Sequence, residues 1–105
     1  MASMIKQLAA QNLTSAGTAQ ALTTTATICQ SVLIVAKSTN AGSVYVGDST
    51  VDSTNTFPIA AGESYRIEAP QAPGGGADDM DLSTIFWDGG TTNDDIFVIY
   101  AQRTN

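Results

Sequence analysis

Histidine is absent from this chain of 105 residues, and cysteine occurs once. Histidine is the usual general base of enzymes and the commonest metal ligand, so Ser-His-Asp sets, Cys-His sets and histidine-rich metal sites are excluded. The single Cys29 cannot form an internal disulfide. Because it lies beside an apolar run, we expect it to be a small buried side chain. The sequence therefore predicts a protein that is not an enzyme and has no cofactor.

Charge is also scarce, and positive charge most of all. Charged residues make up 13% of the chain, against a usual share of roughly 25%. Ten acidic residues face four basic ones, which gives a net charge of −6. The basic residues are Lys6, Lys37, Arg66 and Arg103, and they form no run. Nucleic acids and anionic membranes are bound through clustered Lys and Arg, so we expect neither as a partner.

Long apolar runs are missing as well. The longest uninterrupted one, residues 32–36, is far shorter than the ~20 residues of a membrane-spanning helix. Residues 1–6 do not have the basic start and apolar run of a signal peptide, which predicts a cytosolic origin.

What the sequence does contain is a series of short β-branched and aromatic segments separated by Gly, Pro and polar turns. The expected strands are residues 28–37, 43–47, 64–68, 82–88 and 95–102, and residues 18–27 are expected to be a strand or an extended loop. This pattern predicts an all-β fold, an antiparallel β-sandwich or jelly roll. The apolar runs predict that 28–37 and 95–102 are central strands, the first covered on both faces. The short loop after residue 37 predicts a hairpin between 28–37 and 43–47.

The segment before Gly17 has a different composition. Its apolar residues would fit a short helix, but its Gln and Asn content makes an extended conformation at least as good an interpretation. We therefore divide the chain into an N-terminal arm, residues 1–16, and a single β-sandwich domain, residues 17–105. Phe86 and Trp87 must face opposite sides of a strand, so one of them is a candidate for an outer face. The candidate interface residues are Ile5, Leu8, Leu13 and Trp87.

Two groups of acids are the remaining candidates for chemistry. Asp78, Asp79 and Asp81 follow a glycine run, and Asp94 and Asp95 are adjacent in a turn. Paired carboxylates can serve as a glycosidase acid and base, or bind calcium. The spacing does not match an EF-hand loop, and solvated loop acids are the favoured interpretation. Calcium binding by the first group stays open. The run 74–76 lacks the spaced glycines and the Lys of a phosphate-binding loop.

Two stretches carry a resemblance to a known group of proteins. SVYVGDSTVD at 43–52, followed by FPIAAGESY at 57–65, resembles small structural proteins of tailed bacteriophages. Asp81-Leu82 and the strand 96–100 match the later parts of the same pattern. The chain departs from it at Asn55-Thr56, where the pattern more often has Asn-Gly.

The resemblance implies a trimeric jelly-roll cement or decoration protein on the outside of a capsid. The implied partners are other copies of the chain and the major capsid protein, and the implied location is the virion, after synthesis in the host cytoplasm. A chain of net charge −6 would repel packaged DNA, which favours the exterior. The alternative is a tail or head-fibre module that binds host-surface carbohydrate on a platform of aromatic side chains.

Overall fold

The computed structural model describes residues 3–69 and 79–103, and almost all of its regular structure is β-strand. The elements are β1 (Ser3–Gln7), β2 (Gln11–Asn12), β3 (Gln20–Ala21), β4 (Ile28–Cys29), β5 (Ser31–Ala36), β6 (Val44–Gly47), β7 (Ser64–Glu68), β8 (Met80–Asp81), the 3-10 turn η1 (Leu82–Thr84), β9 (Phe86–Gly89) and β10 (Asp95–Arg103). The all-β prediction is confirmed, and the jelly-roll topology stays a prediction. Within the described ranges, no helix is long and apolar enough to cross a membrane.

The large sheet has the strand order β1-β10-β5-β7, and all its pairs are antiparallel. β2 also pairs with β10, so β1 and β2 lie one after the other along the same edge. From Gln7 to Gln11 this edge advances four residues, while β10 advances three, from Ile99 to Ile96. The extra residue makes a β-bulge between β1 and β2.

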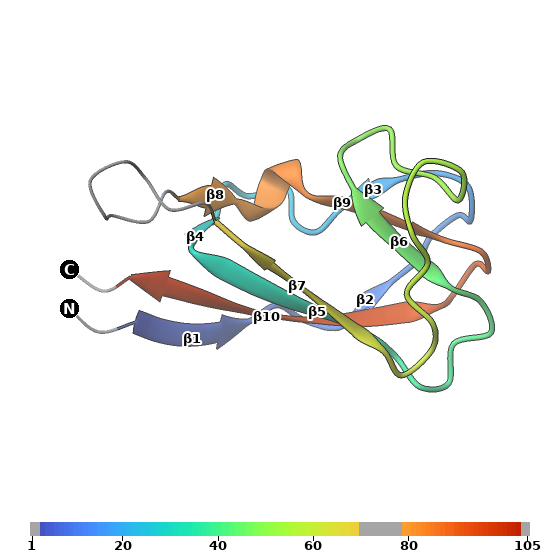
Figure 1. The fold of residues 1–105 in the computed structure, drawn as a ribbon, viewed down its shortest axis with the longest axis horizontal. Helices are drawn as coiled ribbons and strands as arrows, with labels where there is room; N and C mark the ends of the chain where they lie inside the picture. Colours follow the sequence, from blue (N-terminus) through green and yellow to red (C-terminus); the bar gives the residue numbers. More distant parts are fainter. Residues whose placement is uncertain (1–2, 70–78, 104–105) are drawn as a thin grey trace.

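A smaller sheet, β3-β9-β6, lies against one face of the large sheet, and the short β4-β8 ladder sits near the end that holds both termini (Figure 1). β4 leads into β5 and β8 leads through η1 into β9, so this ladder links the two layers. The result is a two-layer β-sandwich.

The core fills the space between the layers. Because side chains alternate along a strand, β5 turns Val32, Ile34 and Ala36 inward, and these pair directly with Tyr100, Val98 and Ile96 of β10. Trp87, Leu13 and Leu82 complete the interior from the other elements, and Cys29 is buried among them as expected. Full burial of one large apolar side chain contributes about 1.5–3 kcal/mol.

The predicted central positions of β5 and β10 are confirmed, since β5 lies between β10 and β7, and β10 lies between β1 and β5. Gly62 adopts a φ of 84°, which the turn before β7 requires and which glycine tolerates best.

The predicted hairpin between β5 and β6 is wrong. β6 pairs with β9 of the small sheet, whereas β5 pairs with β10 and β7. The turn after Ala36 therefore carries the chain from one layer to the other. β5 is also not covered on both faces, because Leu33 and Val35 are only half-buried.

Nor is the N-terminal segment a separate arm or a helix. Residues 3–7 and 11–12 pair with β10 of the same chain, and Leu13 lies fully inside the core. The segment predicted to extend from the domain is an edge of the domain's own large sheet.

Candidate interaction surface

The outer face of the large sheet is the face turned away from the small sheet, and it is unusually apolar. Register places Ile5 of β1, Phe97 and Ile99 of β10, and Leu33 and Val35 of β5 on this face. Ile5 is 68% exposed, Phe97 42% and Ile99 44%. We call these five residues the outer apolar patch. Large exposed apolar patches on soluble domains mark interaction sites.

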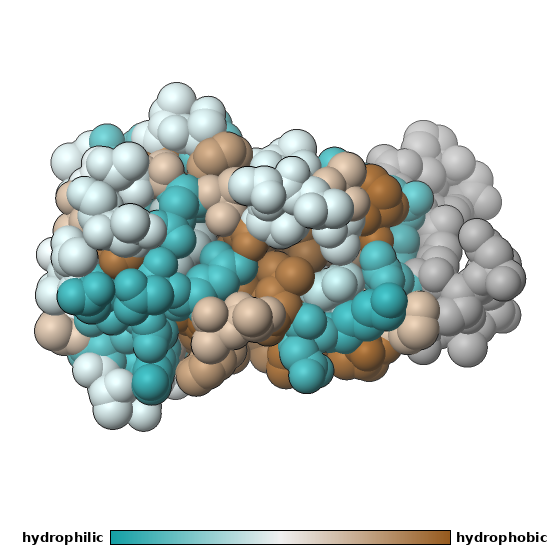
Figure 2. Space-filling model, turned by 180° about the vertical axis from the view of Figure 1, so that it is seen from behind, coloured by the Kyte–Doolittle hydropathy of each residue, from teal (hydrophilic) through white to brown (hydrophobic). Residues whose placement is uncertain are grey.

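A polar rim and a hollow complete this surface. Ser64, Arg66 and Glu68 of β7 share the outer face and are all exposed. A hollow of about 100 Å³ lies beside them, lined by Ile5, Ser31, Leu33, Arg66, Ile99, Tyr100 and Ala101. An apolar centre with a polar rim is the anatomy of a protein–protein interface. Seen from behind, apolar side chains are exposed near the middle of the molecule, and the loop end is more polar (Figure 2).

The structure separates the four predicted interface residues. Ile5 lies in the outer apolar patch, and Leu8 is half-buried against the core. Leu13 and Trp87 are fully buried, and the Trp87 indole N–H donates to Oε1 of Gln11 at 3.0 Å. Phe86 and Trp87 do face opposite sides, with Trp87 inward. The other four patch residues were not predicted to lie at an interface, although they belong to unbroken apolar runs in β5 and β10.

An aromatic pair lies at the β7 edge. The rings of Phe57 and Tyr65 meet edge to face, with centroids 4.8 Å apart and planes at 72°. Both side chains are exposed. The pair does not belong to the outer face, because Tyr65 is paired with Ile34 and shares its inward side.

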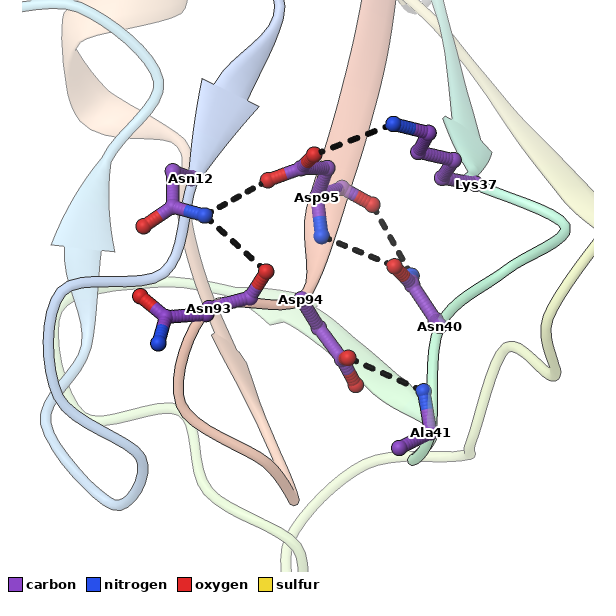
Figure 3. Close-up of polar contacts among 7 residues, drawn as sticks. All are labelled: Asn12, Lys37, Asn40, Ala41, Asn93, Asp94 and Asp95. Atoms are coloured by element: carbon purple, nitrogen blue, oxygen red, sulfur yellow. Dashed lines mark hydrogen bonds and ion pairs between the residues drawn. The ribbon is translucent and has the colours of Figure 1, made fainter.

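At the loop end, Asp94 is a structural acid. Its carboxylate accepts from the backbone N–H of Ala41 at 2.9 Å (Figure 3). It also accepts from the backbone N–H of Gly42 at 2.8 Å, and the residue is only 6% exposed. The expectation of a solvated loop acid is therefore wrong for Asp94. A carboxylate with both oxygens held by backbone donors fixes a turn.

Asp95 is held by different partners. Its backbone N–H and C=O bond to the side-chain amide of Asn40 at 2.8 and 2.9 Å. Its carboxylate accepts from the Asn12 amide at 2.7 Å and forms an ion pair with Lys37 at 3.5 Å (Figure 3). The two adjacent acids thus point at different partners and do not face each other as a catalytic pair.

Asp81 acts as an N-cap. It accepts from the backbone N–H of Thr27 at 3.0 Å and from the backbone and hydroxyl of Ser83, both at 2.9 Å, and these bonds lower its pKa in that order. Burial, with the nearby charges of Asp81 and Asp79, raises the pKa of Cys29 to about 11, so its thiol is neutral at pH 7. Asp78 lies outside the described residues.

Two similar turns occupy the loop after β6. Asp48 accepts from the backbone and hydroxyl of Thr50, and Asp52 accepts in the same way from Thr54. The hydroxyl bonds, followed by the backbone bonds, lower the pKa of both acids. These acids stabilise their own loop.

The described residues contain no group of three or more Cys, Asp or Glu side chains arranged to hold a metal ion. Comparison with known proteins adds no assignment: no family model matches the chain, and neither a curated protein nor a solved structure is significantly similar to it. The geometry on this surface is suited to binding through shape and apolar contact.

Proposed function

We propose that this chain is a structural protein of a bacteriophage virion that binds the outer capsid as a cement or decoration protein and stabilises the head. In this proposal it is not an enzyme, and it acts as a homo-oligomer, expected to be a trimer, on the major capsid protein.

The outer apolar patch is the observation that carries the proposal. A monomeric protein has little reason to expose Ile5, Phe97 and Ile99 on one sheet face, whereas an assembly protein covers such a face. The resemblance of residues 43–65 to phage structural proteins, and the net charge of −6, support an exterior capsid position.

The stabilising mechanism needs no catalysis. A protein that binds only the intact shell raises the apparent stability of that shell by mass action. An oligomer engages several capsid sites together and gains affinity through effective concentration.

The test uses particles of the encoding phage that lack this protein. We expect them to assemble but to release DNA at a lower temperature or on chelation, and added purified protein should restore their heat resistance. Unchanged heat resistance in the depleted particles would contradict the proposal.

The second candidate is a tail or head-fibre module that binds host-surface carbohydrate, and the exposed Phe57–Tyr65 pair favours it. Sugars stack on exposed aromatic rings, so Phe57→Ala and Tyr65→Ala would then abolish glycan binding. Depleted particles would lose adsorption to host cells while keeping their heat resistance.

A further inference from the structure

Two successive rows of side chains cross the outer face of the large sheet. Strand register places Gln7, Ile99, Leu33 and Arg66 in the first row. The same registers place Ile5, Ala101, Ser31 and Glu68 in the second row. Each row contains one residue from β1, β10, β5 and β7, in that order.

The central positions of the two rows differ in size. The first row has Ile99 and Leu33 at its centre, whereas the second has Ala101 and Ser31. The hollow of about 100 Å³ includes these two small residues in its lining, with the larger Ile99 and Leu33 beside them. One row therefore presents a ridge, and the neighbouring row a depression.

The β7 ends of the rows carry opposite charges. The first row ends at Arg66 and the second at Glu68, two residues apart on the same face of β7. Both side chains are exposed, and neither has an ion-pair partner among the residues that the structure describes.

We propose that the outer face binds the outer face of a second copy of this chain, across a two-fold axis that runs between the two rows. This axis lies parallel to the rows, between the two facing sheets. It reverses the strand direction but keeps each strand opposite the same strand of the other chain. The first row of each chain therefore meets the second row of the other. Leu33 then packs over Ser31 of the partner subunit, and Ile99 over Ala101 of the partner subunit. Arg66 meets Glu68 of the partner subunit, twice in each pair.

A second copy is the occupant because the face is complementary to itself. A partner must present small residues opposite Leu33 and Ile99, and a negative charge opposite Arg66 at the matching end. The outer face of a second copy, turned by 180°, presents both the small residues and the negative charge at these positions. Two-fold contacts of this self-complementary kind are the commonest in homo-oligomers.

The area of the outer face sets the expected affinity of the two chains for each other. Strands lie about 4.8 Å apart and residues about 3.4 Å apart along a strand. With β10 and the β1–β2 edge nine to ten residues long, and β5 and β7 five to six, the face covers about 500 Å². A pair would bury about 1,000 Å² in total, at the lower end for specific complexes. We expect a dissociation constant in the micromolar range.

This inference does not depend on the proposed virion role. A two-fold contact produces assemblies with an even number of chains, either a dimer or two trimers joined face to face. A measured solution mass equal to a single trimer would contradict the pairing and leave the capsid role in place. Unchanged heat resistance of the depleted particles would contradict the capsid role and leave the pairing in place.

The decisive experiment reverses the two charges separately and then mixes the variants. By sedimentation equilibrium, Arg66→Glu and Glu68→Arg should each weaken self-association about tenfold, because like charges then meet twice in each pair. An equal mixture should form heteropairs, seen by native mass spectrometry, with affinity within about threefold of the original chain. Lys6→Glu, a reversal on the other face of β1, is the matched control and should leave pairing unchanged.

A second variant tests the apolar contact independently. Ser31→Leu fills the hollow at an outward position and should give a folded monomer, with Ser53→Leu in the exposed 48–56 loop as control. Circular dichroism checks the fold of each variant. A monomeric original chain at about 100 µM, or charge variants whose mixture forms no heteropair, would overturn the inference.

Discussion

Two aspartates, Asp88 and Asp94, lie inside this protein and hold backbone donors there. Asp88 accepts from the N–H groups of Gly17 and Gly89, and Asp94 from those of Ala41 and Gly42. Each carboxylate thus joins chain segments that are far apart in the sequence. A buried donor left without an acceptor costs about 1–3 kcal/mol, so these two side chains matter to stability.

Replacing Asp94 tests this directly. The variant Asp94→Asn would keep one acceptor oxygen but turn an NH2 group toward the second backbone N–H. We expect the free energy of unfolding to fall by about 1–3 kcal/mol in urea titrations. Ser53→Ala, at an exposed loop residue, is the control and should change it by less than about 0.5 kcal/mol. Equal stability of both variants would show that Asp94 does not hold the turn.

The pKa of Asp81 predicts how stability changes with acid. Its bonds to Thr27 and Ser83 lower the pKa in the folded chain, so the unfolded chain binds the proton more tightly. The stabilisation is therefore present above about pH 4, the unfolded value, and is lost as the pH falls through the lower, folded pKa. Asp81→Asn keeps an acceptor oxygen but cannot titrate. Urea unfolding between pH 7 and pH 2.5 should show a smaller loss of stability for this variant, and parallel curves would contradict the assignment.

The sequence did not reveal the buried position of Asp94, because its partners lie about fifty residues away in the chain. Two adjacent aspartates before a strand look like an ordinary polar turn. Cys29 could be placed correctly, since the apolar run 32–36 lies close to it in the sequence. Burial could thus be predicted from the sequence where it follows from nearby residues, and not where it depends on partners that are distant in the chain.

Among the elements, β1 and β2 hold the domain in different ways. β1 contributes a backbone ladder with β10, and its described side chains, Met4–Gln7, are exposed. β2 leads directly into Leu13, which is in the core, and Gln11 bonds to Trp87. We therefore expect the segment of β2 and Leu13 to contribute more to the stability of the domain than β1 does.

Truncated variants should distinguish the contributions of β1 and β2 to the stability of the domain. We expect deletion of residues 1–7 to leave a folded domain of reduced stability, because it removes a ladder and little core. Leu13→Ala in the full chain should cost about 2–5 kcal/mol, as for other large-to-small changes at fully buried sites. Deletion of residues 1–14 should then unfold the domain, although the sequence alone suggested that it would stay folded. Thermal melts followed by circular dichroism measure all three, and a folded 15–105 fragment would contradict the role of Leu13.

Strand existence was predictable, whereas strand pairing was not. β-branched runs and turn residues are local signals, and they located β5, β6, β7 and β10 nearly correctly. Which strands pair depends on how apolar faces meet across the whole domain, so the short loop between β5 and β6 indicated a hairpin that does not form. The apolar outer side of β5 was interpreted as burial within the chain, but it belongs to the outer apolar patch.

At the scale of the whole molecule, the pairing of the first and last strands is the dominant feature. Ser3 is opposite Arg103, so the large sheet cannot form until almost the entire chain is available. Contacts of such long range slow folding because the loop must be closed before they can form.

We therefore expect refolding on the millisecond-to-second timescale that is typical of all-β domains. Stopped-flow fluorescence of Trp87, which is buried in the folded chain, can follow it. The truncation of residues 1–7, which removes the longest-range pairing, should refold no more slowly than the full chain. A microsecond phase that accounts for the whole signal would contradict this expectation.

The antiparallel pairing of β1 with β10 also brings both ends of the chain to one end of the molecule (Figure 1). A short Gly-Ser linker could join the original ends into a closed ring, and the ring could be reopened near the exposed Ser53. Such a circular permutant would keep every strand pair of the large sheet. Its new ends would emerge beside β6, so a peptide fused to them would leave the molecule far from Ser3 and Arg103.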